Sequence, residues 1–462
     1  MPRPVYELAG IFRQYAELYR RTRKLPLDQL RVLRAIQFCR TSALGGHVEK
    51  CGQCSYTRNS YNSCRNRHCP KCQGTDRMKW LESRQGELLP VEYFHVVFTV
   101  PEEIARIAFY NKAVVYGILF RAAAETLLTI ARDAKHLGAD IGFFGILHTW
   151  GQNLLHHPHV HFVVPGGGIG PDGNWIACRP GFFLPVRVLS RLFRRLFLHA
   201  LLKAFENHQL EFFGQLEPLK DQMAFRAFLD PPRTSAWVVY AKKPFGGPQT
   251  AIQYLGRYTH RVALSNDRIL GVSDGRVTFQ WKDYRSQHRH KSRTMTLDAE
   301  EFIRRFLIHT LPPGFQRIRY FGLMANRHRK PYLAFCRELL TGRQNPCCPQ
   351  SHNVRLCGAF CQRQNGFAAR SVPGGSSESL FHPIPHEHAR ASSALTDFAF
   401  PALSGGSVPR QANHTPYSSP HQAPYALQKL SNTVTEPPAP HCRRQPHAIT
   451  IRLPDHRPIQ IP

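Results

Sequence analysis

Two histidines that flank a single valine form the first candidate site. The segment HHPHVHFVV contains His159 and His161 on either side of Val160. On a β-strand, alternate side chains point to the same face, so both imidazoles can reach one divalent cation while Val160 points into the core. Imidazole binds Mn, Zn, Fe or Ni, whereas Mg also needs oxygen ligands. His157 would share this face only if the strand continued back through Pro158, which a proline disfavours.

Two tyrosines in the segment QTAIQYLGRYTHRVA form the second candidate site. Tyr254 and Tyr258 are four residues apart, so in a helix they lie on one face. A tyrosine hydroxyl is a poor nucleophile at its usual pKa of about 10. A metal that polarises a phosphate, helped by Arg257 and Arg261, would favour its attack. Taken alone, tyrosines at this spacing more often pack in a core.

A cysteine-rich segment predicts a zinc site. Two C-x-x-C pairs are the first choice of ligands, and they contain Cys51, Cys54, Cys69 and Cys72. Four thiolates form a closed tetrahedral site with no open position, so the zinc would be structural. Cys64 and His68 are further candidates, either in place of one of the four or together with His47 in a second site.

Charge and composition favour a nucleic-acid partner. The chain has 462 residues with 61 Lys and Arg against 31 Asp and Glu, a formal net charge of +30. Such a surplus suits a polyanion, because neutralised phosphates release counterions. The sequence contains no apolar run near the roughly 20 residues of a membrane span and no secretory signal pattern, so we expect a cytoplasmic, nucleoid-associated protein. It also lacks a phosphate-binding loop motif, which argues against a nucleotide cofactor.

The elements that would position these residues alternate between strands and helices. Strands are expected at 94–100, 142–150, 160–164 and 276–281, and helices at 102–135, 187–206, 249–262 and 299–311. This order predicts an α+β fold with an antiparallel central sheet. The expected parts are a helical segment 1–45, a zinc-binding module 46–90, a catalytic domain 91–345 and a tail 346–462. The tail is rich in Pro, Ser and His, so we expect it to be disordered.

Several ordered motifs resemble one known family, the two-tyrosine HUH transposases of rolling-circle-type insertion sequences. The matching segments include SCRNRHCPKCQ, HVVFTVP, HTWGQNLLHHPHVHFVV, YAKKPFGGPQTAIQYLGRYTHRVALSN and YFGLMANRHRK, and they extend from about residue 30 to 345. The resemblance implies an N-terminal zinc-binding domain, a catalytic metal on His159 and His161, and nucleophiles at Tyr254 and Tyr258. The third metal ligand stays open between Gln253, Gln152 and His148.

The resemblance also implies a reaction. A Mg2+- or Mn2+-dependent cleavage of single-stranded or hairpin element ends would leave a 5′-phosphotyrosine, and its later attack by a 3′ hydroxyl would rejoin strands. DNA contacts are expected from Lys242, Lys243, Arg257 and Arg261.

Three alternatives remain at this point. The first is a replication initiator or relaxase with the same chemistry. The second is a zinc-dependent DNA-binding protein without catalysis, such as an inactive transposase copy. The third is a tyrosine recombinase, to which His290, Arg293 and Tyr320 would belong, although it leaves the histidine pair unexplained.

Overall fold

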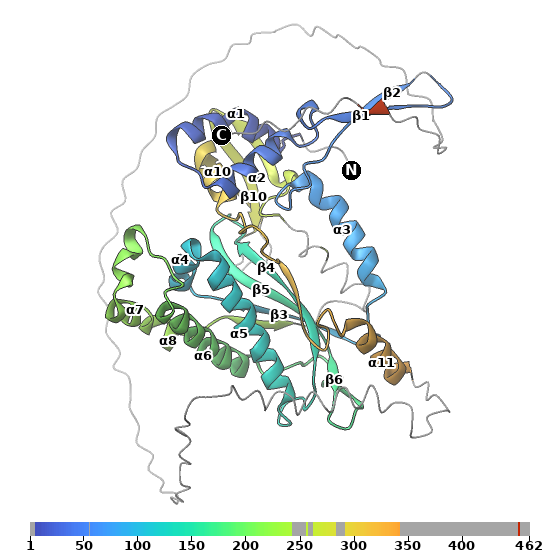
Figure 1. Cartoon of the computed structure of the whole chain (residues 1–462), viewed down its shortest axis with the longest axis vertical. Helices are drawn as coiled ribbons and strands as arrows, with labels where there is room; N and C mark the ends of the chain where they lie inside the picture. The colour runs from blue at the N-terminus through green and yellow to red at the C-terminus, as the bar shows by residue number, and fades with distance from the viewer. Residues whose placement is uncertain are drawn as a thin grey trace, which may run out of the picture. The chain divides into compact units, whose positions relative to one another are not determined.

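The computed structural model describes residues 5–54, 56–242, 256, 262–282, 292–341 and 451–452 (Figure 1). Of residues 75, 76, 242, 451 and 452 it describes the backbone alone. The tail expected after residue 345 lies outside the described residues, apart from 451–452.

A five-stranded antiparallel sheet forms the centre of residues 91–345, as far as the structure describes them. Its strand order is β12-β4-β5-β3-β8. The strands are β3 (Tyr93–Thr99), β4 (Gly142–Trp150), β5 (His156–Pro165), β8 (Val239–Lys242) and β12 (Ile318–Gly322). Aromatic and β-branched residues fill these strands, as is usual where both faces of a sheet are covered. The expected α+β fold with an antiparallel sheet is confirmed.

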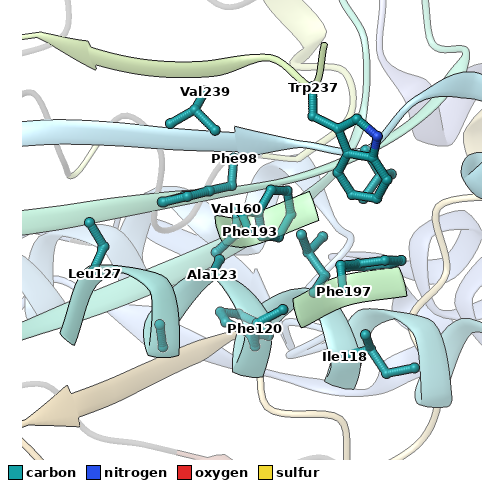
Figure 2. Close-up of a cluster of buried hydrophobic side chains, with 14 of the residues drawn as sticks. Phe98, Ile118, Phe120, Ala123, Leu127, Val160, Phe193, Phe197, Trp237 and Val239 are labelled. Atoms are coloured by element: carbon teal, nitrogen blue, oxygen red, sulfur yellow. The ribbon is translucent and has the colours of Figure 1, made fainter. Parts of the chain in front are cut away.

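Helices cover one face of this sheet and build the largest hydrophobic core. They are α4 (Glu102–Tyr110), α5 (Lys112–Arg132) and α6 (Val186–Glu206). Figure 2 shows Phe98 and Val160 of the sheet facing Phe120 of α5 and Phe193 of α6. The rings of Phe98 and Phe193 meet edge to face, with centroids 4.9 Å apart. By length and composition α5 could cross a membrane, but two thirds of its most apolar window is buried in this core.

One long helix was expected over 102–135, and the structure has two. The break falls at Asn111, whose side-chain amide donates to the carbonyls of Ile107 and Glu211. The Asn111 side-chain oxygen accepts from the backbone N–H of Glu211. A side chain that satisfies backbone groups in this way competes with the helical pattern and ends α4.

The N-terminal helices share a second core with a distant part of the chain. Helices α1 (Leu8–Thr22) and α2 (Leu27–Phe38) pack with α10 (Ala299–Leu307) and a three-stranded sheet. That sheet has the order β11-β10-β9 and consists of β9 (Ile269–Ser273), β10 (Arg276–Lys282) and β11 (Ser292–Asp298). Trp150, the last residue of β4, and Leu154, in the turn after it, belong to the same core. The second core therefore reaches the end of a strand that carries a candidate histidine.

The opposite face of the central sheet meets the helix that follows the cysteines. This helix is α3 (Pro70–Gln85), and its Trp80 ring contacts the Phe144 ring of β4 edge to face. Before α3, the strands β1 (Gly46–Lys50) and β2 (Thr57–Tyr61) form a hairpin, and β13 (Ile451–Arg452) pairs with β1. The remaining elements are η1 (Ser42–Leu44), β6 (Gly167–Ile169), β7 (Trp175–Ala177), η2 (Gly214–Lys220), α7 (Gln222–Phe228), α8 (Asp230–Thr234), η3 (Asn266–Arg268) and α11 (Arg329–Thr341).

Candidate active site and metal centres

Pairing of β4 with β5 brings three histidines together on the face of the sheet away from α5. His148 lies directly opposite His159, and His161 follows two residues later on the same face. One ring nitrogen from each of the three lies within 4.8 Å of the others. His148 was one of three candidates for the third metal ligand. The structure places it beside the predicted pair.

Each imidazole in this group is held by a neighbour. The Nδ1 of His159 lies 2.7 Å from the His157 carbonyl, and the Nδ1 of His161 lies 2.7 Å from Nε2 of His95. The His148 ring stacks on Trp150 with centroids 4.8 Å apart. In His159 and His161 one ring nitrogen is held in this way, which directs the other nitrogen at a metal. Three imidazole donors that can reach one point fit a divalent transition metal.

Strand β5 continues through Pro158, although a proline was expected to disfavour this. It begins at His156, and the β4–β5 register is interrupted between His148 and Trp150. Pro158 lies at this irregularity and beyond the last β3 pair, where proline is tolerated in a sheet. As a result the exposed His157 presents its carbonyl to His159.

His156, at the start of β5, serves the core rather than the site. Its Nε2 bonds the Tyr116 hydroxyl at 2.8 Å, and its Nδ1 bonds the Ala105 carbonyl at 3.2 Å. Burial lowers the pKa of His156 to about 3, so the ring is neutral at pH 7.

The cysteine cluster contains a different set of residues from the one predicted. The sulfur atoms that lie within 4.8 Å of one another are those of Cys39, Cys64, Cys69 and Cys72. The distance from Cys72 Sγ is 3.6 Å to Cys39 Sγ and 3.5 Å to Cys64 Sγ. A tetrahedral site with Zn–S bonds of about 2.3 Å has S–S edges of about 3.8 Å, so these four sulfurs fit zinc.

The predicted ligands Cys51 and Cys54 lie apart from this group, in the turn between β1 and β2. Cys39, at the end of α2, was missed because it belongs to no C-x-x-C pair. Cys64 was a further candidate, and it does join the group.

Local structure explains how the four cysteines come together. Cys69 occupies the N-cap position of α3 and Cys72 lies in its first turn, where the helix dipole favours thiolates. A hydrogen bond from the Cys64 thiol lowers the pKa of the Cys39 thiol well below its usual value, and the same bond raises the pKa of Cys64. Neighbouring thiols thus stabilise one thiolate among them, and a divalent cation would stabilise all four.

His68, a further zinc candidate, instead joins a contact between the cysteine loop and residues 308–315. Its Nε2 accepts from the backbone N–H of Leu311 at 3.4 Å, and burial lowers its pKa to about 3. The neighbouring Arg67 donates to the carbonyls of Phe315 at 2.6 Å and Pro312 at 2.9 Å. This contact joins the cysteine loop to the segment that leads into β12.

The same segment also reaches the end of β4. The two ring nitrogens of His309 bond the Thr149 hydroxyl at 3.2 Å and the Leu154 carbonyl at 3.1 Å. Lys112 of α5 donates to the carbonyls of Ile308 and Thr310. The segment 308–315 is therefore bonded both to the cysteine loop and to Thr149, the residue after His148.

The predicted nucleophiles lie outside the described residues. These are Tyr254 and Tyr258, and the predicted residues Lys243, Gln253, Arg257 and Arg261 also lie outside the described residues. Lys242 is on β8 opposite His95, and its side chain is not described. Gly256 is described, and it is helical and buried. A Cβ added there would lie 2.7 Å from a methyl of Leu81 on α3, so the backbone at 256 packs closely against α3.

Two sequence families match this chain. Residues 142–331 match the family described as "Putative transposase", and residues 11–100 match the "Transposase zinc-binding domain". "Putative transposase y4qJ" of Sinorhizobium fredii is 61% identical over 342 residues, which cover 74% of this chain and 85% of that protein. The "Transposase for insertion sequence element IS801" of Pseudomonas savastanoi pv. phaseolicola is 30% identical over 305 residues, 65% of this chain and 72% of that protein.

The class of protein is therefore a transposase. The chain belongs to the family of insertion-sequence transposases that carry a zinc-binding domain ahead of the transposase domain, as its motifs predicted.

Solved structures of a conjugative relaxase, TrwC, are also similar in part. The complex of TrwC with a 27-mer DNA is 15% identical with a TM-score of 0.21, and covers 53% of this chain and 73% of that one. A metal-bound TrwC complex with oriT DNA is 15% identical with a TM-score of 0.20, and covers 53% of this chain and 71% of that one. Overlaps of this size carry no conclusion about activity.

Proposed function

We propose that this transposase cleaves and rejoins single-stranded DNA at the ends of its element, in a rolling-circle type of transposition. The observation that carries the proposal is the group of three imidazoles on paired strands of a transposase domain. His148, His159 and His161 can reach one cation from a sheet face that is not filled by the main core. Within the described residues this group contains no carboxylate.

The histidines would hold a divalent cation, Mg2+ or Mn2+, with oxygen ligands from water or the DNA phosphate completing its coordination. Such an ion, when bound, polarises a phosphoryl oxygen and orients the scissile phosphate. His148 and His161 are buried, whereas His159 is partly exposed. The three ligands therefore approach from the sheet side, and a phosphate can approach from the solvent side.

Tyr254 or Tyr258 would supply the nucleophile. The tyrosine oxygen forms a bond to phosphorus while the bond from phosphorus to the 3′ oxygen breaks. The phenolic proton is lost, and the released 3′ oxygen gains a proton to become a hydroxyl. The product is a 5′-phosphotyrosine that keeps the phosphodiester energy, so that a 3′ hydroxyl can rejoin strands without ATP. Lys242, Lys243, Arg257 and Arg261 would bind backbone phosphates.

The helical, buried Gly256 supports this assignment of the tyrosines. It packs against Leu81 of α3, and the neighbouring Trp80 of α3 contacts Phe144. Phe144 lies on the same face of β4 as His148, because the two are separated by an even number of residues. Residue 256 therefore packs on the helix that contacts the sheet face carrying the histidines.

The zinc-binding domain would have a structural role. We assign zinc to Cys39, Cys64, Cys69 and Cys72, whose sulfur atoms lie close together. The role is structural because four thiolates leave no coordination position for a substrate. The DNA partner would be a single-stranded or hairpin element end, which the surplus of positive charge attracts.

The test is a search for a covalent protein–DNA adduct. Single-stranded oligonucleotides from the DNA that flanks the gene are incubated with Mg2+ or Mn2+ and the wild type, Y254F, Y258F or Y254F/Y258F, and are separated on denaturing gels. Y320F is the matched control, because Tyr320 is the tyrosine that a recombinase mechanism would use. We expect adducts with the wild type and Y320F and none with the double variant. DNA binding without any adduct would instead indicate a non-catalytic DNA-binding protein, and loss with Y320F a recombinase.

A further inference from the structure

We propose that His95 is a positioning residue for the histidine group, which directs His161 toward the metal. The inference rests on the proposed metal site of His148, His159 and His161. His95 was not among the candidates from the sequence, where it is one residue of the apolar strand HVVFTV.

Sheet register places His95 beside His161. In the pairing of β3 with β5, His95 lies opposite Val163 and Val97 lies opposite His161, so the two histidines are diagonal neighbours on one face. Nε2 of His95 is 2.7 Å from Nδ1 of His161. The two rings are nearly parallel, with an interplanar angle of 4°. His95 is 6% exposed and His161 is 7% exposed, so water competes little for this bond.

The chemistry of the ligand decides the direction of this hydrogen bond. A histidine that binds metal through Nε2 needs a lone pair there, so its proton is on Nδ1. The Nδ1–H of His161 must then donate, and Nε2 of His95 must accept. If His95 donated instead, the proton of His161 would move to Nε2 and block the ligand position. With His95 as the acceptor, this hydrogen bond holds His161 in its metal-binding tautomer.

The two ligands on β5 are held by different acceptors. His159 is directed by a backbone carbonyl, which no substitution at His157 removes. His161 is directed by a side chain from another strand, so His95 can be changed without altering any ligand. Because His95 is a neutral acceptor and not a carboxylate, it adds no negative charge beside the metal. The metal would keep more of its positive charge for the phosphate.

The experiment measures Mn2+ affinity directly, with the full zinc-loaded chain. Free Mn2+ is followed by electron paramagnetic resonance during titration of the wild type, H95Q and H95N. The Gln amide reaches the position of Nε2, whereas the Asn amide ends near the position of Nδ1 and is too short to accept from His161. We expect H95N to weaken Mn2+ binding by roughly 10- to 100-fold and H95Q to stay close to the wild type. Zinc content should be unchanged in both.

Two controls separate positioning from packing and from the site itself. Val97 lies on β3 with His95 and directly opposite His161 of β5. V97A removes an apolar side chain there, and we expect this variant to bind Mn2+ like the wild type. H161A should lose the bound Mn2+. If H95N does not fold, H95L replaces it, because leucine fills the buried space without an acceptor.

Wild-type affinity in H95N, or an equal loss in H95Q and H95N, would overturn the role of His95. In either case the metal site itself would stand, provided that H161A loses the ion. If Mn2+ binding is unaffected by H161A, the proposed catalytic site fails, and the inference fails with it.

Discussion

The three histidines come from two strands that pair directly with each other, whereas the four cysteines come from three separate segments. Register alone sets the spacing of the histidines, because His148 and His159 are opposite residues of one ladder. The cysteines come from the end of α2, a loop, and the first turn of α3. No continuous ladder of backbone hydrogen bonds holds Cys39 beside Cys72.

This difference predicts different roles for the metals at the two sites. A sheet with a buried face keeps its register without an ion, so the histidine group should persist when its metal is removed. A cluster of thiols joined by loops depends on the ion, because binding free energy is then folding free energy. We therefore expect metal removal to affect chemistry at one site and stability at the other.

The largest expected effect is on stability, from Cys39→Ser. Loss of one ligand should remove zinc and lower the free energy of unfolding by on the order of 4 kcal/mol, since loss of a metal is among the most damaging changes. Zinc content by mass spectrometry and urea unfolding measure both quantities. Cys51→Ser is the matched control, because Cys51 lies outside the group, and it should retain zinc. If C39S retained zinc and C51S lost it, the ligands would be the two C-x-x-C pairs instead.

The next effect is on activity, from His159→Ala. It should lower the rate of DNA cleavage by at least about 100-fold, as expected for loss of a metal ligand. The free energy of unfolding should change by less than about 1 kcal/mol, because His159 is partly exposed. Cleavage rates with Mn2+ and urea unfolding measure the two. The control His157→Ala removes an exposed neighbour outside the group and should leave cleavage unchanged. Unfolding of H159A would show that this site, too, is structural.

A smaller effect should follow from Arg67→Met. It removes two charge-assisted hydrogen bonds between the cysteine loop and the carbonyls of Pro312 and Phe315. We expect the free energy of unfolding to fall by about 2 kcal/mol while zinc stays bound. Arg65→Met removes the same charge from an exposed position of the loop and should change stability by less than about 0.5 kcal/mol. Equal effects of the two changes would mean that net charge, and not the contact, is responsible.

The smallest effect should appear as a dependence of stability on pH. Burial lowers the pKa of His156 to about 3 and that of His309 well below its usual value. Between pH 6.5 and the lowered values the unfolded chain binds protons that the native chain does not, so stability falls as pH falls. Each histidine contributes up to about 1.4 kcal/mol per pH unit there.

Urea unfolding at pH 6.5 and 5.5 measures this dependence. His156→Gln should reduce the change in the free energy of unfolding between these two pH values. His208→Gln, at an exposed position, should leave that change as it is in the wild type. An unchanged slope in H156Q would show that His156 is not the source.

Elements with a strong local pattern could be predicted from the sequence. The expected strand 142–150 is β4, residue for residue, and the expected helix 187–206 is α6 to within one residue. His148 could be named only as one of three candidates, because strand spacing does not reveal which residue lies across the ladder from His159. Register is a tertiary property, and it places His148 directly opposite His159.

Other features depend on contacts between distant segments and could not be predicted. Cys39 has no cysteine near it in sequence and joins the cluster only because α2 ends beside α3. His95 looked like one residue of an apolar strand, and its role depends on pairing with β5. Helices were expected in 1–45, but the sequence did not reveal that α1 and α2 would pack against α10 and share a core with residues of β9 and β10.

The most direct test of two distinct metal centres is a crystal structure of the full chain with zinc and Mn2+, with anomalous data collected at both absorption edges. We predict a zinc peak among the sulfurs of Cys39, Cys64, Cys69 and Cys72, and a manganese peak at the Nε2 atoms of His148, His159 and His161. A zinc peak bound by Cys51 and Cys54, or manganese bound away from the histidines, would contradict the account.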